Sequence, residues 1–409
     1  MMRTFFLVSV LWMGMVTSAS AQKPLSTGSW RAFLNRNDSE RIVFSYNLQW
    51  MNNMPLISVV NADEKIELKD VAISGDSLFA KMPVFESEFR MKIVSKDSVN
   101  GIWIKGTSGK NQVIPFAATA KQPYRFKAVK GNAQKNISGK WSVTFASEKG
   151  EARDIAVFNQ KGNSLTGSVL TPTGDYRYLQ GIVTGDSVLL STFDGVHALL
   201  FTGNISQQTI TGSFYSSLNN KKAWTAFRND TATLPDLAAM YLKDTADNQL
   251  HFRFPDLNGN MVSINDPQFK NKVVVIQLMG SWCPNCMDET AFLSDWYKKN
   301  RSRGVEVIGL AYEYTTDFER SKKSLGKFQQ RFAIDYPLLI TGVSVADSLK
   351  TEKTLPQFTP IKSFPTTIII DKQGQVRKIE TDFAGPGTGV YYDQFKKEFE
   401  STVDTLLSE

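Results

Sequence analysis

Residues 273–286 read Val-Val-Val-Ile-Gln-Leu-Met-Gly-Ser-Trp-Cys-Pro-Asn-Cys. The first seven residues form a nearly continuous apolar run, which is typical of a central strand buried on both faces of a parallel sheet. Pro284 is favoured in the first turn of a helix, where its missing N–H loses no partner. We therefore expect a helix from Pro284 to about Asn300, with Cys283 at its start.

The spacing of the two cysteines suits redox chemistry. At a helix N-terminus, unpaired N–H groups and the positive end of the dipole favour a thiolate, so the pKa of Cys283 should fall from about 8.5 to about 7 or below. Cys286 lies one turn further on the same side, close enough to form a disulfide and displace a bound substrate. We predict that Cys283 is accessible and attacks, that Cys286 is buried and resolves, and that Trp282 limits access.

Three other kinds of site use a pair of cysteines. A zinc site needs two more ligands, and the only histidines, His197 and His251, have no ligand spacing around them. Attachment of a c-type haem needs a histidine directly after the second cysteine, where Met287 stands. A structural disulfide stays open as an alternative. The redox interpretation requires no metal and no cofactor beyond the Cys283–Cys286 disulfide itself.

The rest of residues 250–409 alternates between strand and helix patterns. This alternation, with an antiparallel pair at one edge, predicts an α/β domain. The further elements expected are a strand at 305–311, a helix within 317–332, a short strand near 336–340, a loop or helix at 345–362, a strand pair at 367–370 and 376–379, and a helix from about 392 to 407.

Residues 25–230 are instead rich in Ser, Thr, Asn and Gly, with short alternating apolar runs that predict antiparallel strands. Motifs recur at an offset of 110 or 111 residues: Trp30 matches Trp141, and Phe116 matches Phe227. We therefore expect two tandem β modules at 22–130 and 131–230, either as separate small barrels or as halves of one sandwich. The matched Trp, Phe and Gly residues are expected in the core and in turns.

Residues 231–249 connect the β modules to the α/β domain. The stretch 233–242 begins Thr-Leu-Pro-Asp and continues with Leu, Ala, Ala, Met, Tyr and Leu. A proline at the start and an acidic residue in the first turn favour a helix. We predict a helical connector.

Composition excludes several classes of protein. Apolar residues make up 42% of the 409 residues, which rules out wholesale disorder. The 47 Lys and Arg residues against 40 Asp and Glu residues give a mild positive charge without a basic block, so we expect no nucleic-acid partner. At the start, Arg3 precedes an apolar stretch from Phe5 to Val16 and the small residues Ala-Ser-Ala at 19–21. This pattern predicts a signal peptide at 1–21 and a protein that is soluble after cleavage, exported most simply to a bacterial periplasm.

Three motifs in chain order carry a family resemblance. They are Phe-Arg-Phe-Pro-Asp-Leu-Asn-Gly at 252–259, Gly-Ser-Trp-Cys-Pro-Asn-Cys at 280–286, and Ser-Phe-Pro-Thr-Thr at 363–367. Over about 160 of the 409 residues the chain resembles the TlpA/ResA-type thiol–disulfide oxidoreductases of the thioredoxin superfamily. The resemblance implies a thioredoxin fold for 250–409, with Pro365 in the cis form beside Cys283. It also implies substrate contacts by Trp282, Pro284, Phe364 and Thr366.

The chain departs from the thioredoxin pattern at one informative position. Thioredoxin keeps a buried acid six residues before its first cysteine, where this chain has Gln277. Glu289, three residues after Cys286, matches an acid in some TlpA/ResA-type members and is our candidate proton acceptor. Glu313 and Tyr314 follow a strand at the edge where α/β sites gather, and are weaker candidates. An approach loop that includes residues 353–362 could shape the choice of partner.

The expected function is that of an exported thiol–disulfide oxidoreductase that reduces protein disulfides. The resemblance implies electrons from a membrane partner and, often, service to c-type cytochrome maturation. Two alternatives stay open. One is a peroxiredoxin-like peroxidase, which would want Thr where Gly280 stands. The other is a binding protein of the cell surface or periplasm, whose β modules recognise a partner.

Overall fold

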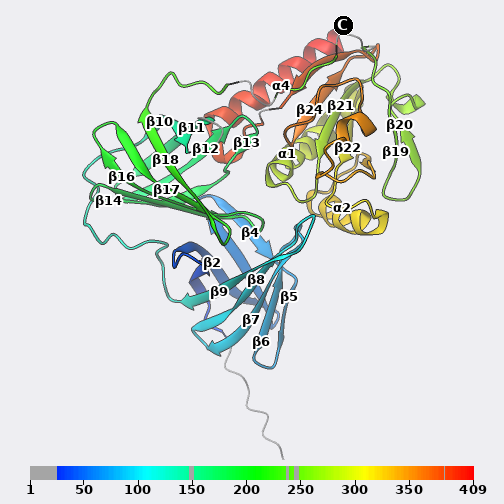
Figure 1. The fold of residues 1–409 in the computed structure, drawn as a ribbon. Helices are drawn as coiled ribbons and strands as arrows, with labels where there is room; N and C mark the ends of the chain where they lie inside the picture. The colour runs from blue at the N-terminus through cyan, green and yellow to red at the C-terminus, as the bar shows by residue number, and fades with distance from the viewer. Residues whose placement is uncertain (1–24, 147–151, 236–238, 244–247, 382) are drawn as a thin grey trace, which may run out of the picture.

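The computed structural model describes residues 25–146, 152–235, 239–243, 248–381 and 383–409. The expected signal peptide at 1–21 lies outside the described residues. Figure 1 shows two β-rich bodies, in blue to cyan and in green, and a C-terminal α/β body in yellow to red. The chain is thus multidomain, with β-rich sheets first and an α/β domain last, as the sequence predicted.

The first β body is one nine-stranded antiparallel sheet in the order β4-β3-β2-β1-β9-β8-β7-β6-β5. Alternate residues of its strands point into an apolar core that contains Trp30, Phe44 and Trp103. Pairing of β1 with β9 joins the first and last strands, so that the sheet is barrel-like. The strands are β1 (Gly28–Asn35), β2 (Arg41–Met51), β3 (Met54–Asn61), β4 (Glu64–Leu68), β5 (Val71–Ser74), β6 (Ser77–Lys81), β7 (Ser87–Ser95), β8 (Ser98–Lys105) and β9 (Gln112–Ala120).

The second β body has the order β11-β10-β18-β17-β16-β15-β14-β12-β13, and an additional β11–β12 pairing closes it into a barrel. It has its own core, which includes Trp141, Phe201 and Trp224. The sequence was compatible with two separate small barrels or with the two halves of one sandwich. The structure has two separate sheets, so the modules are not halves of one sandwich. The strands are β10 (Gly139–Phe145), β11 (Ala152–Lys161), β12 (Ser164–Thr171), β13 (Gly174–Asp175), β14 (Leu179–Thr184), β15 (Ser187–Phe193), β16 (Ala198–Ser206), β17 (Thr209–Ser216) and β18 (Asn220–Arg228).

The sequence repeat reappears as repeated structure. Trp30 and Trp141 are both buried, and each indole N–H donates to the carbonyl oxygen four residues earlier, at 2.9 Å. Gly101 and Gly212 lie where an added Cβ would come within 2.1 and 1.8 Å of a backbone oxygen on the neighbouring strand. The matched Trp residues therefore lie in the core, as predicted, and the two glycines allow close packing within strands rather than forming turns. The core prediction is wrong for Phe227, which is 54% exposed because its side chain lies on the outer face of β18. We propose 22–130 and 131–230 as the domain boundaries.

The prediction of a helical connector at 231–249 is wrong for the residues that the structure describes there, since none of them is helical. The chain instead runs extended beside residues 357–359: the N–H of Lys243 donates to Gln357 at 2.8 Å, and the N–H of Thr359 donates to Tyr241 at 2.9 Å. These bonds use backbone groups that a helix would need for itself.

The C-terminal domain is built on a five-stranded sheet in the order β23-β22-β21-β24-β25. β21 pairs in parallel with β22 and antiparallel with β24, and all its residues are buried, as predicted. The elements are β19 (Arg253–Pro255), β20 (Met261–Ser263), η1 (Pro267–Phe269), β21 (Val273–Met279), α1 (Pro284–Asn300), η2 (Arg301–Arg303), β22 (Val305–Ala311), α2 (Phe318–Phe332), β23 (Leu338–Ile340), α3 (Lys350–Thr354), β24 (Thr366–Ile370), β25 (Val376–Glu380), η3 (Pro386–Thr388) and α4 (Val390–Ser408).

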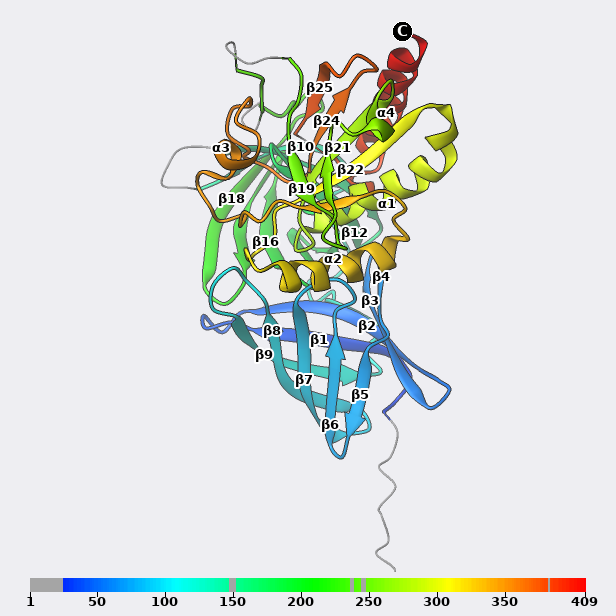
Figure 2. The ribbon, with the colours of Figure 1, turned by 90° about the vertical axis from the view of Figure 1, so that its right-hand side faces the viewer.

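The two faces of this sheet are covered differently. Apolar residues of α1, α2 and α4 pack on one face, among them Leu293, Phe328 and Phe399. The other face is covered by the connector and by the approach loop, whose Phe358 is fully buried. The apolar cluster under the helices continues into the first β domain, and Figure 2 shows α2 lying directly above that domain.

Candidate redox site

Cys283 and Cys286 form a disulfide at the junction of β21 and α1. Cys283 is the N-cap residue of α1, and its sulfur accepts a hydrogen bond from the backbone N–H of Cys286 at 3.1 Å. Pro284 occupies the first turn and is buried. The predicted position of the pair at a helix N-terminus is confirmed, and the N–H that faces the Cys283 sulfur would stabilise a thiolate after reduction.

The predicted accessibility of Cys283 is wrong for this structure. Cys283 is only 3% exposed and Cys286 is fully buried. A helix N-terminus at the end of a buried strand would be open to solvent in an isolated α/β domain. Here the β domains cover it, and a sequence pattern carries no signal of that distant contact.

The segment with Pro365 lies beside the disulfide. The Phe364–Pro365 peptide bond is cis, as the resemblance implied. The carbonyl oxygen of Phe364 lies 3.4 Å from the sulfur of Cys283. Thr366 is buried, and its hydroxyl donates to the carbonyl oxygen of Ser363 at 3.0 Å. The backbone of Phe364, rather than the Thr366 side chain, therefore faces the sulfur of Cys283.

Trp282 is fixed in place by its neighbours. Its indole N–H donates to the carbonyl oxygen of Tyr312 at 2.8 Å. Its ring stacks on Tyr314 at a centroid distance of 5.4 Å and meets the edge of Phe364 at 5.7 Å. The rings of Trp282, Tyr314 and Phe364 thus pack together beside Cys283.

Glu289 lies one turn beyond Cys286 in α1 and is 2% exposed. The side-chain N–H of Gln277 donates to one carboxyl oxygen at 2.7 Å, and the hydroxyl of Thr367 donates to the other at 2.6 Å. Burial raises the pKa of Glu289 to about 7, although both hydrogen bonds act to lower it. A carboxyl group with this pKa can hold or release a proton near neutral pH.

Gln277 also connects Glu289 to Cys286, since its side-chain N–H lies 3.4 Å from the carbonyl oxygen of Cys286. In the sequence, Gln277 is notable only as the place of a missing acid, and Thr367 has no predicted role. Both were detectable in principle, because polar residues in buried strands need partners.

Glu313 occupies the opposite side of the site. The backbone N–H and the hydroxyl of Ser281 donate to its two carboxyl oxygens at 2.8 and 2.6 Å. Burial raises the pKa of Glu313 to about 7. The carboxyl group therefore anchors the loop that precedes Cys283. By contrast, the approach loop at 353–362 packs on the other face of the sheet through Leu355 and Phe358.

The C-terminal part of the chain is similar in sequence to known proteins. Residues 245–379 match the profile of the AhpC/TSA family. The C-terminal part is a thioredoxin-like domain. Over 131 residues it is 25% identical to the thiol-disulfide oxidoreductase ResA of Bacillus subtilis (strain 168), covering 32% of this chain and 64% of that relative. Over 130 residues it is 27% identical to ResA of Geobacillus kaustophilus (strain HTA426), covering 32% and 65%. The chain thus spans less than two thirds of the length of these relatives.

Solved structures similar to the thioredoxin-like domain include a thiol:disulfide interchange protein of the thioredoxin family from Chlorobium tepidum TLS. It is 18% identical, covers 40% of this chain and 99% of that chain, and has a TM-score of 0.30. Another is a protein described as a putative thiol:disulfide interchange protein DsbE from Chlorobium tepidum, 18% identical, with coverages of 38% and 96% and a TM-score of 0.28.

The described residues hold neither a metal-binding cluster nor a helix suited to a membrane. Among them, no cluster of three or more His, Cys, Asp or Glu side chains is arranged to hold a metal ion. In the same part of the chain, no helix combines the length and the apolar character needed to cross a membrane.

Proposed function

We propose that this protein is an exported thiol–disulfide oxidoreductase that reduces disulfides of protein substrates through Cys283 and Cys286. One observation carries the proposal: the two cysteines form a disulfide at the N-terminus of α1, and Glu289 lies buried one turn beyond it. A purely structural disulfide has no need of a buried carboxyl group with a pKa of about 7. A redox pair that must lose a proton from a buried thiol does need one.

The reaction runs in two exchanges from the reduced dithiol. The Cys283 thiolate attacks one sulfur of the substrate disulfide; a Cys283–substrate bond forms, the substrate S–S bond breaks, and the leaving thiolate takes up a proton. Cys286 then loses its proton and attacks the Cys283 sulfur; the Cys283–Cys286 bond forms, the Cys283–substrate bond breaks, and the second substrate thiolate leaves and takes up a proton. The substrate gains two electrons and two protons, and the enzyme is left with the disulfide seen here.

Each residue has a defined part in these steps. The N–H of Cys286 stabilises the Cys283 thiolate, and Glu289 in its ionised form accepts the proton of Cys286. Phe364, next to Pro365, presents its carbonyl group to the bound chain. Trp282 and Pro284 border the place where the substrate sulfur enters, and Thr366 supports the Phe364 segment from within.

The setting of the reaction is also part of the proposal. The leader at 1–21 would direct the chain to an exported compartment, most simply the bacterial periplasm. In that compartment, a dithiol of another protein must return two electrons to the Cys283–Cys286 disulfide. We propose that this electron donor is a membrane protein. The relatives carry the name thiol-disulfide oxidoreductase. Maturation of c-type cytochromes is the cellular role that we carry over from the resemblance.

A direct test uses the reduced full chain with insulin as the disulfide substrate. Thiols on insulin are counted by mass spectrometry after the enzyme has been reduced and freed of reductant. We expect one insulin disulfide reduced for each enzyme disulfide formed, and none with Cys283→Ser. Insulin left fully oxidised while hydrogen peroxide oxidises the pair would contradict the proposal and favour the peroxidase alternative.

A further inference from the structure

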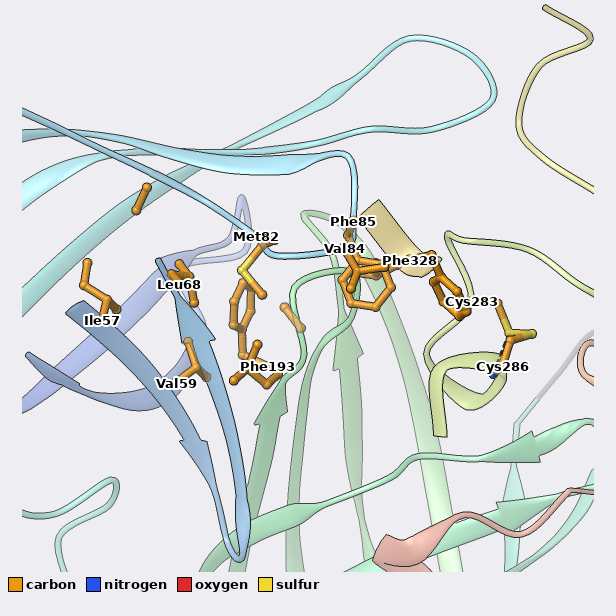
Figure 3. Close-up of a cluster of buried hydrophobic side chains, with 14 of the residues drawn as sticks. Ile57, Val59, Leu68, Met82, Val84, Phe85, Phe193, Cys283, Cys286 and Phe328 are labelled. Atoms are coloured by element: carbon orange, nitrogen blue, oxygen red, sulfur yellow. Dashed lines mark hydrogen bonds between the residues drawn. A yellow bond between two sulfur atoms is a disulfide. The ribbon is translucent and has the colours of Figure 1, made fainter. Parts of the chain in front are cut away.

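The connection between β6 and β7, residues 82–86, is buried at three of its five residues, although chain connections normally run exposed over a protein surface. Met82, Val84 and Phe85 are each less than 5% exposed. They belong to the same apolar cluster as Cys283 and Phe328. Figure 3 shows Phe85 beside Phe328, on the side of Cys283 that faces the first β domain. This segment, which we name the cover segment, lies against the redox site.

The second β domain closes the same site from another side. Gly174 in β13 lies so near Asn285, between the two cysteines, that an added Cβ would come within 3.1 Å of the Asn285 side chain. Arg177 donates to both carboxyl oxygens of Asp288 at 2.7 Å and pairs with Glu64 of the first β domain at 2.7 Å. Three domains therefore meet at the first turns of α1.

The edge of the cover segment is fastened by polar contacts. Glu86 accepts hydrogen bonds from the guanidinium group of Arg320 at 3.1 and 2.5 Å and from the hydroxyl of Ser324 at 3.1 Å, both on α2. The side chains of Glu86 and Arg320 keep 36% and 42% of their surface exposed. The Glu86–Arg320 ion pair is thus an exposed contact of the domain interface, whereas the Arg177–Asp288 ion pair is a buried one.

The enclosed space beside Trp282 is too small for a substrate. The cavity lined by Phe85, Glu86, Trp282, Glu313 and Arg320 measures about 10 Å³. A single water molecule needs about that much room. Thiol–disulfide exchange requires the incoming sulfur to touch the sulfur under attack. Cys283 does not line this cavity and is itself only 3% exposed, so in this arrangement its sulfur is nearly closed to a partner from outside.

We propose that the β domains are a gate over the redox site, and that the cover segment occupies the place of the substrate. The Glu86–Arg320 ion pair, which we name the latch, holds this gate closed. Partners react only with molecules in which the gate is open. This inference rests on the proposed function and adds its regulation and its selectivity. The rate of exchange then scales with the fraction of open molecules, because the closed form is unreactive. Weakening the latch should increase the rate without changing the cysteine chemistry.

The test measures how fast dithiothreitol reduces the Cys283–Cys286 disulfide in the full-length chain. Glu86→Arg places two like charges at the latch and should raise the rate about fivefold or more. The double exchange Glu86→Arg with Arg320→Glu restores the pairing and should return most of the wild-type protection. Asp76→Arg is the matched control, since it makes the same charge change at an exposed pair with Lys92 in the same β domain.

Circular dichroism and gel filtration confirm that each variant is folded before its rate is taken. Equal rates for wild type, Glu86→Arg and Asp76→Arg would overturn the gate, and so would faster exchange in the charge-swapped double variant than in Glu86→Arg. The insulin assay on the same proteins separates the two proposals. If Glu86→Arg speeds reduction by dithiothreitol but no variant reduces insulin, the gate stands and the proposed substrate class fails.

Discussion

Gln277 donates a hydrogen bond to the carboxyl group of Glu289 across 2.7 Å, from the central strand to the first helix. The bond fixes the carboxyl group beside the turn that holds Cys286. Thioredoxin places an acid on the strand at this position, whereas this chain places an amide on the strand and the acid on the helix. The proton acceptor of the proposed mechanism has thus moved across the interface between strand and helix.

The first prediction concerns Glu289→Gln and the resolving step. Burial raises the pKa of Glu289 from 4.5 to about 7, so the carboxyl group is largely ionised, and able to accept a proton, only above neutral pH. The rate at which Cys286 resolves a mixed disulfide should therefore rise through pH 7 in the wild type. In Glu289→Gln the rise at pH 7 should disappear, and the rate at pH 8 should fall about 100-fold. Stopped-flow measurement with a labelled Cys283 adduct checks this. A variant with the wild-type profile would remove Glu289 from proton transfer.

The second prediction concerns stability against pH. A carboxyl group whose folded pKa is raised contributes stability that is complete below its unfolded pKa of 4.5 and is lost as the pH rises to about 7. The wild type should lose about 3 kcal/mol from this one group between those values. Glu289→Gln does not titrate, so its loss should be smaller by that amount.

Urea unfolding of the oxidised proteins at pH 4.5 and 7.5 measures the difference. The control is Glu400→Gln, an exposed position on α4, which should follow the wild type. If Glu289→Gln loses as much stability as the wild type between these two pH values, the pKa of Glu289 is not raised in the folded protein, which contradicts the prediction.

The third prediction concerns Arg177, which joins all three domains through Glu64 and Asp288. Removing one partner of a buried ion pair leaves charge without compensation, which costs about 3–5 kcal/mol. Arg177→Met should lower the free energy of unfolding by about that amount. In a thermal scan, the domains of the variant should unfold in separate transitions. Lys92→Met, at an exposed pair, should leave the unfolding curve unchanged. Equal curves for the two variants would contradict the three-domain junction.

The structural features that could be predicted are those determined by residues close together in the sequence. The apolar run at 273–279 and Pro284 are local signals, and the strand, the helix and the placement of Cys283 at its start are all confirmed. Glu289 could be placed beside Cys286 by helical spacing alone. The two β sheets followed from alternation, and their repeat followed from the 110–111 residue offset.

What the sequence could not predict depended on distant contacts. Alternation shows which residues of β6 and β7 point inward, but it does not show that Phe85 would pack near Cys283. In the described residues 239–243 the expected helix is replaced by backbone pairing of Tyr241 with Thr359 and of Lys243 with Gln357. The predicted solvent access of Cys283 was wrong because a contact between separate domains buries this residue.

The measurement that tests the central claim most directly is the trapping of mixed disulfides by single-cysteine variants. The chain has only two cysteines, so each variant keeps a single thiol. Cys286→Ala keeps the nucleophile at the helix N-terminus without a resolver, and Cys283→Ala keeps only the fully buried thiol. Both are expressed with residues 1–21 and separated by non-reducing electrophoresis, and the adducts are identified by mass spectrometry. We predict abundant adducts with protein partners for Cys286→Ala and few for Cys283→Ala; equal trapping, or no adducts from either variant, would contradict a thiol–disulfide oxidoreductase that attacks through Cys283.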